Sequence, residues 1–140
     1  MTSASGTLAK LRGCGAGDGL PEACQTGLSL KSYVLDWGGS GEALLFLTCL
    51  GGSAGDFQPL AINFTDQFHV LGLTRRGQGQ SDRPDTGYAT SQLVDDISAF
   101  LDLMNIKRAT LVGYSLAGNE LTEFASLCPK RVVRLVYLDA

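Results

Sequence analysis

A serine lies at a position of the chain that suits nucleophilic chemistry. Ser115 belongs to the segment 113–118, GYSLAG, which follows a predicted strand and begins a predicted helix. A serine at such a tight strand-to-helix turn, a nucleophile elbow, is held in a strained backbone, and the residues two positions before and after it must be small. Gly113 and Ala117 meet that requirement. A serine that only caps the helix is the alternative, and the flanking strand and helix favour the elbow.

The elbow predicts attack by the Ser115 hydroxyl on an electrophilic carbon. The helix that begins at Leu116 would bring its N-terminal dipole and a free N–H to the developing negative charge. The serine also needs a base, and an acid that orients the base. The single histidine, His69, opens an earlier strand, about five residues of about 3.3 Å each from the sheet end where Ser115 lies. Asp139 is either a candidate acid or a plain strand-end residue.

The elements that would position Ser115 alternate between strands and helices. An alternating pattern predicts a strand at 32–37, and apolar runs predict buried strands at 42–48, 69–73, 109–112 and 132–138. Helices are predicted at 57–64, 93–104 and 116–127. Thr90 or Ser91 can cap the second helix, and Pro129 stops the third. The fold class is therefore α/β, with a mostly parallel sheet flanked by helices.

The first 27 residues differ in composition from the remainder of the chain. They are rich in Gly, Ser, Ala and Thr, and the segment GCGAGDG at 13–19 does not favour regular structure. We expect a flexible leader at 1–27 and one domain at 28–140. Because the chain has neither a long apolar run nor the apolar core of a signal peptide, we expect no membrane span and a cytoplasmic location.

Charge and cysteine spacing argue against several functions. The formal net charge is −3 and the basic residues are scattered, so no nucleic-acid-binding stripe is expected. The cysteines show no C-x-x-C spacing, and we expect no metal site and no other cofactor. Cys14 and Cys24 could form a disulfide or remain reduced. The glycine-rich segments at 51–55 and 77–81 lack the patterns of a phosphate-binding loop.

Four segments together resemble the N-terminal half of α/β-hydrolase fold proteins. They are LDWGGSGEALLFL at 35–47, LGGSAGDF at 50–57, RRGQGQSDRP at 75–84 and GYSLAGNELTEFASLCPKRVVRLVYLDA at 113–140. The resemblance implies a partial α/β-hydrolase fold that lacks its last strands and cap. It also implies a serine hydrolase for an ester, amide or related bond of a small-molecule substrate. The catalytic His would follow the nucleophile in such a fold, so this chain is expected to be inactive alone.

The resemblance implies roles for two loops near Ser115. In such proteins the loop after the first buried strand supplies an oxyanion donor, which here would be the N–H of Leu50, paired with the N–H of Leu116. The usual His-Gly dipeptide of that loop is replaced by Thr48 and Cys49. The arginines that begin the 75–81 segment are expected to tie their own loop down.

Three hypotheses for function stay open from the sequence. The chain is a fragment of a serine hydrolase, a short non-catalytic relative that binds a partner or small ligand, or a different α/β module that binds a nucleotide. The strand at 132–138 lies near the end of the chain and would expose unpaired backbone groups beside apolar side chains. We therefore expect self-association through this edge strand.

Overall fold

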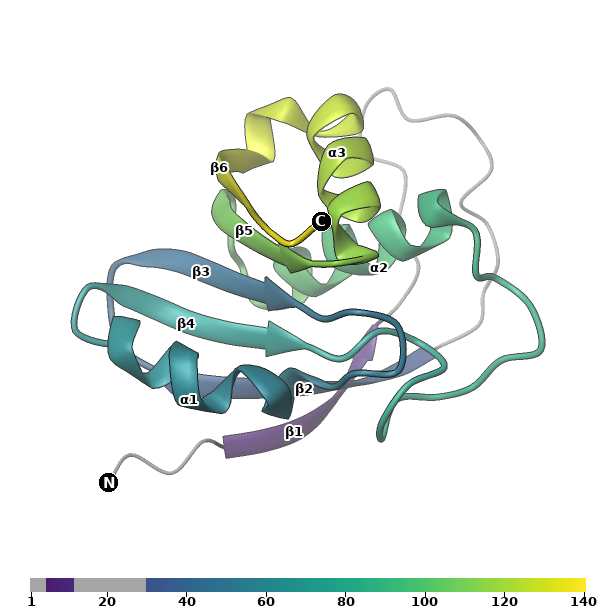
Figure 1. Ribbon diagram of the computed structural model, residues 1–140, viewed down its shortest axis with the longest axis horizontal. Helices are drawn as coiled ribbons and strands as arrows, with labels where there is room; N and C mark the ends of the chain where they lie inside the picture. Colours follow the sequence, from purple (N-terminus) through teal and green to yellow (C-terminus); the bar gives the residue numbers. More distant parts are fainter. Residues whose placement is uncertain (1–4, 12–29) are drawn as a thin grey trace.

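A mixed sheet of six strands forms the centre of the molecule (Figure 1). The computed structural model describes residues 5–11 and 30–140. The strands are β1 (Ser5–Leu11), β2 (Leu30–Gly38), β3 (Glu42–Leu47), β4 (Phe68–Leu73), β5 (Ala109–Tyr114) and β6 (Val132–Leu138). Their order across the sheet is β1-β2-β4-β3-β5-β6. Strands β4, β3, β5 and β6 run parallel, and β1 and β2 pair antiparallel, which confirms the predicted α/β class.

Helices cover both faces of the sheet. Helix α1 (Gln58–Ala61), extended at both ends by 3-10 turns, lies on one face, and α2 (Thr90–Leu103) and α3 (Ala117–Leu127) lie on the other (Figure 1). On the α1 face, Phe46 packs against Trp37 and Phe57, with ring centroids 6.3 Å and 4.8 Å away. On the opposite face, Phe100 of α2 and Phe124 of α3 are fully buried in one cluster. No helix in the described part of the chain is long and apolar enough to cross a membrane.

Two local expectations from the sequence require correction. Residues 5–11, which we expected within the flexible leader, form β1, because their backbone pairs with β2 along its whole length. Residues 12–27, with Cys14 and Cys24, lie outside the described residues. The predicted side-chain cap of α2 at Thr90 or Ser91 is also wrong. Ala89 occupies the cap position in an extended conformation, and it offers no side-chain acceptor.

Strand β6 forms an edge of the sheet. It pairs with β5 on one side, and no strand of the described residues pairs with its other side. Next to it, on the α1 face, lies an open apolar groove of about 490 Å³. Val136 and Leu138 of β6 line this groove together with Phe46 of β3 and Phe64 beyond α1. An edge strand beside apolar surface is a template for pairing with another chain.

We predict that the chain self-associates through β6, and that Val136→Lys weakens the association. Val136 faces the groove and is partly exposed, so a lysine there places a charge where a second copy would pack. Size-exclusion chromatography with light scattering should give a mass above the 14.8 kDa of the monomer for the parent chain. Leu103→Lys, at an exposed position of α2, should leave the mass unchanged. A monomeric parent chain with a cooperative melt would contradict the prediction.

Candidate active site

Ser115 occupies the sharp turn between β5 and α3, as the sequence predicted. Its φ angle is +53°, in the left-handed region that non-glycine residues rarely adopt. The N–H of Ser115 donates to the carbonyl of Leu138 in β6 at 3.1 Å, and its carbonyl accepts from the N–H of Gly118 at 2.9 Å. The residue is exposed. The backbone therefore presents Ser115 to solvent at the carboxyl end of the sheet.

Close packing explains why the elbow needs small residues. A Cβ atom on Gly113 would lie 2.7 Å from Leu121 Cδ1 and 3.2 Å from the carbonyl carbon of Ala117. Ala117 is itself fully buried. Because β5 and α3 approach this closely, a larger residue at Gly113 would force the helix away from the strand.

The loop after β3 lies at the same end of the sheet as Ser115, where the parallel strands finish. Strand β3 ends at Leu47, which pairs with Gly113 of β5, so the chain leaves both strands side by side. The following turn is closed by a hydrogen bond of 3.3 Å from the N–H of Gly52 to the carbonyl of Cys49. Leu50 lies within it with its side chain largely exposed. The structure thus brings the predicted oxyanion loop and the elbow to adjacent strand ends, and the donor role of Leu50 and Leu116 stays a prediction.

Asp139 follows β6 at the same carboxyl end of the sheet. Tyr114 pairs with Leu138, so Ser115 and Asp139 each come directly after paired residues of neighbouring strands. Asp139 is exposed and has a φ of +47°. Its position suits an acid that orients a base near Ser115, and that role also stays a prediction.

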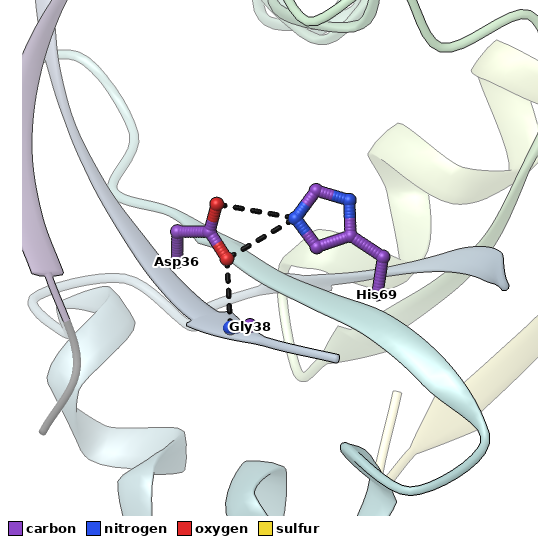
Figure 2. Close-up of polar contacts among 3 residues, drawn as sticks. All are labelled: Asp36, Gly38 and His69. Carbon is purple, nitrogen blue, oxygen red and sulfur yellow. Dashed lines mark hydrogen bonds and ion pairs between the residues drawn. The ribbon is translucent and has the colours of Figure 1, made fainter. Parts of the chain in front are cut away.

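His69 lies at the opposite end of the sheet. It stands in register with Ala43, and Ala43 with Ala109, so His69 is level with a residue six positions before Ser115. Six strand residues span about 20 Å. The His69 Nε2 lies 3.1 Å from both carboxylate oxygens of Asp36, which also accepts from the N–H of Gly38 at 2.8 Å (Figure 2). The separation of about 20 Å along the strands confirms that His69 is not the base for Ser115.

A buried ion pair lies beneath the candidate site. Arg75, in the loop after β4, donates to the carboxylate of Glu120 in α3 and to the carbonyl of Thr48 at 3.2 Å. The side chains of Arg75 and Glu120 are only 7% and 4% exposed. Burial raises the pKa of Glu120 to about 7, although the charge and hydrogen bond of Arg75 act to lower it. The pair joins three segments around the elbow.

The second arginine ties the same loop to α2. Arg76 donates two hydrogen bonds of 2.7 Å to the two carboxylate oxygens of Asp96. The expectation that the arginines hold their loop down is therefore confirmed. Glu120 was not among the residues singled out from the sequence, because its partner Arg75 lies 45 positions away in the chain.

The described residues contain no cluster of three or more His, Cys, Asp or Glu side chains that could hold a metal ion. Cys49 and Cys128 are free thiols. Cys49 belongs to the turn beside Ser115.

We predict that Glu120→Gln flattens the pH dependence of the free energy of unfolding between about pH 4.5 and 7. Since the pKa of Glu120 is raised from 4.5 to about 7 in the folded state, the folded chain holds this proton more tightly than the unfolded chain. The stabilisation is complete below about pH 4.5 and is lost as the pH rises through about 7. It amounts to about 3 kcal/mol.

Urea unfolding at pH 4.5 and pH 7.5 tests this prediction. Glu123→Gln, a change at a less buried position of the same helix, should keep the pH dependence of the parent chain. An identical pH dependence for the parent chain and Glu120→Gln would show that Glu120 titrates normally.

Comparison with known proteins identifies the family. The sequence profile described as alpha/beta hydrolase fold matches residues 42–140. The chain is 34% identical over 101 residues to the 2-(acetamidomethylene)succinate hydrolase of Mesorhizobium japonicum, an alignment that covers 72% of this chain and 36% of that protein. It is 32% identical over 95 residues to the 3-oxoadipate enol-lactonase 2 of Acinetobacter baylyi, covering 65% of this chain and 36% of that protein.

Solved structures agree with the sequence relatives. A solved N-acyl homoserine lactone degrading enzyme superposes with a TM-score of 0.75 at 31% identity, covering 78% of this chain and 42% of that one. The chain thus spans less than half the length of these relatives. The match favours the first two hypotheses over a nucleotide-binding module. The chain belongs to the α/β-hydrolase fold family.

Proposed function

We propose that the chain carries the nucleophile and the oxyanion donors of a serine hydrolase. The observation that carries this proposal is the strained, exposed position of Ser115 between β5 and α3. Backbone strain of this kind costs on the order of 1–3 kcal/mol and is concentrated at functional sites. A serine that only capped α3 would need no left-handed backbone. The enzymatic character of the related hydrolases gives further support.

The proposed reaction begins with attack by the Ser115 Oγ on the carbonyl carbon of the substrate. The carbonyl oxygen becomes an oxyanion and accepts hydrogen bonds from the N–H groups of Leu50 and Leu116. The N-terminal end of α3 adds its positive dipole at the same point. Collapse of this tetrahedral intermediate releases the leaving group with a proton and leaves an acyl group on Ser115. Water then cleaves the acyl-serine bond by the same route.

The base for this reaction comes from outside the 140 residues. His69 is too distant, and the sequence contains no second histidine. Asp139 would orient an incoming histidine from the end of β6. The chain alone is therefore inactive, or nearly so, towards esters. A short non-catalytic relative that binds a partner or small ligand is the alternative, and the position of His69 is the observation that favours it.

The proposed substrates are small molecules with an ester, lactone or amide carbonyl. Three relatives carry names that denote hydrolysis of an acetamidomethylene succinate, hydrolysis of an enol-lactone and degradation of an N-acyl homoserine lactone. All of these compounds present a carbonyl carbon to a nucleophile.

We predict that imidazole in solution supplies the missing base. With p-nitrophenyl acetate alone, the chain should show little turnover, because no imidazole side chain reaches Ser115. With added imidazole, acetylation of Ser115 should accelerate at least about 10-fold, since a general base contributes about 10²–10⁴ when it is well placed. Peptide mass spectrometry locates the acetyl group, and the release of p-nitrophenol gives the rate.

Two serine variants control this experiment. Ser115→Ala should lose the imidazole-dependent reaction above the background of imidazole itself. Ser126→Ala, at an exposed position of α3, should retain it. Absence of an acetyl group on Ser115 under both conditions would reject the nucleophile and favour the non-catalytic relative. Fast turnover without imidazole that disappears in Ser115→Ala would instead show that a base is present in the chain.

A further inference from the structure

Gln78 is a buried polar residue in the loop after β4, and its side-chain amide is fully occupied. The amide orientation is assigned from the neighbouring donors and acceptors, which place the nitrogen toward the turn after β3. In this orientation the nitrogen donates to the carbonyl of Gly52 at 2.8 Å and to that of Cys49 at 3.1 Å. The amide oxygen accepts from the N–H of Gly51 and from Arg75 Nη1, both at 3.2 Å. Three of these four bonds go to backbone groups of one turn, Cys49–Gly52.

The Cys49–Gly52 turn is closed by one backbone hydrogen bond in addition to its bonds to this amide. Its own closing hydrogen bond, from the N–H of Gly52 to the carbonyl of Cys49, is long at 3.3 Å. Gly51 adopts a φ of +81°, and a Cβ atom on Gly52 would lie 2.6 Å from Thr48 Oγ1. Gln78 hydrogen-bonds to both ends of the turn, Cys49 and Gly52, and to its third residue, Gly51. Leu50 lies between these points in the chain.

The amide of Gln78 is in turn held by the buried ion pair. Arg75 donates to Gln78 through Nη1 and to Glu120 and the carbonyl of Thr48 through Nη2. Glu120 belongs to α3, whose N-terminal end follows Ser115. A continuous set of hydrogen bonds therefore runs from the helix of the elbow to the turn after β3. The side chains of Arg75, Gln78 and Glu120 are buried, so bulk water competes little for the hydrogen bonds between them.

We propose that Gln78 is the positioning residue of the oxyanion site: through its bonds to the Cys49–Gly52 turn it aims the N–H of Leu50 at the oxygen that becomes charged when Ser115 attacks. Arg75 and Glu120 keep the Gln78 amide in the required orientation. This inference rests on the proposed function, because it assumes that Ser115 attacks and that Leu50 donates. Gln78 itself does not touch the substrate.

Gln78→Met tests the role of the hydrogen bonds, because methionine keeps the length of the side chain and removes its polar atoms. Gln80→Met is the matched control, since Gln80 lies in the same loop but is exposed. Hydrogen–deuterium exchange of the peptide over residues 48–53 reports the order of the turn. Imidazole-assisted acetylation of Ser115 by p-nitrophenyl acetate, measured over a range of ester concentrations, reports its function.

Gln78→Met should speed exchange in the turn at least about 10-fold and leave exchange in β5 unchanged. The maximal acetylation rate should fall about 10-fold or more, while the ester concentration for half-maximal rate stays constant, because an oxyanion donor acts mainly in the transition state. Gln80→Met should match the parent chain in both measurements. A purely structural role would change the stability without this split between the two kinetic parameters.

Three results would overturn the inference. Unchanged exchange in the turn would show that Gln78 does not hold it, whatever the activity. Faster exchange with an unchanged maximal acetylation rate would show that the turn does not supply an oxyanion donor, while the nucleophile remained valid. Failure of the parent chain to be acetylated at Ser115 would reject the proposed function and this role of Gln78 with it.

Discussion

The buried ion pair between Arg75 and Glu120 is the interaction on which the candidate site depends. Removing two charges from water costs several kcal/mol for each ion, so such a pair persists only when its geometry and its other hydrogen bonds compensate. Arg75 compensates by donating to the carbonyl of Thr48 as well as to Glu120. Truncation of the Glu120 side chain would leave the Arg75 guanidinium buried without this acceptor, which costs about 3–5 kcal/mol. The loops after β3 and β4 and the helix α3 meet at this contact.

The strain at Ser115 is supported by the strands beside it. Strand β5 lies between β3 and β6, and both neighbours run parallel to it. The carbonyl of Leu138 accepts from the N–H of Ser115, so β6 continues to hold the chain after β5 has ended. Gly113 and Ala117 allow α3 to pack directly against the strand. The elbow is thus held by elements on both sides. A displacement of β6 would therefore also displace Ser115, whose N–H is bonded to Leu138.

Local patterns were enough to predict most of the fold. The apolar run at 132–138 gave the bounds of β6, and the small residues around Ser115 gave the elbow, because both signals lie within a few neighbouring residues. The strand at 5–11 escaped prediction since it depends on pairing with β2 rather than on its own composition. Gln78 and Glu120 escaped for a related reason. In the sequence they look like solvated polar residues, and only the folded chain brings Glu120 to Arg75 and Gln78 to the Cys49–Gly52 turn.

Parallel strands explain why the only histidine and the candidate nucleophile cannot cooperate. The parallel strands β3, β4 and β5 all begin at one end of the sheet and finish at the other. A residue that begins β4 is therefore a strand length away from a residue that follows β5. His69 is moreover engaged by Asp36 at its own edge. A base for Ser115 has to approach from the carboxyl end of the strands. The exposed residues Leu50 and Leu116 lie at this end, and Asp139 follows β6 next to the end of β5. In the proposed reaction the nucleophile, the oxyanion donors and their buried supports would come from this chain, and a base other than His69 would accept the proton.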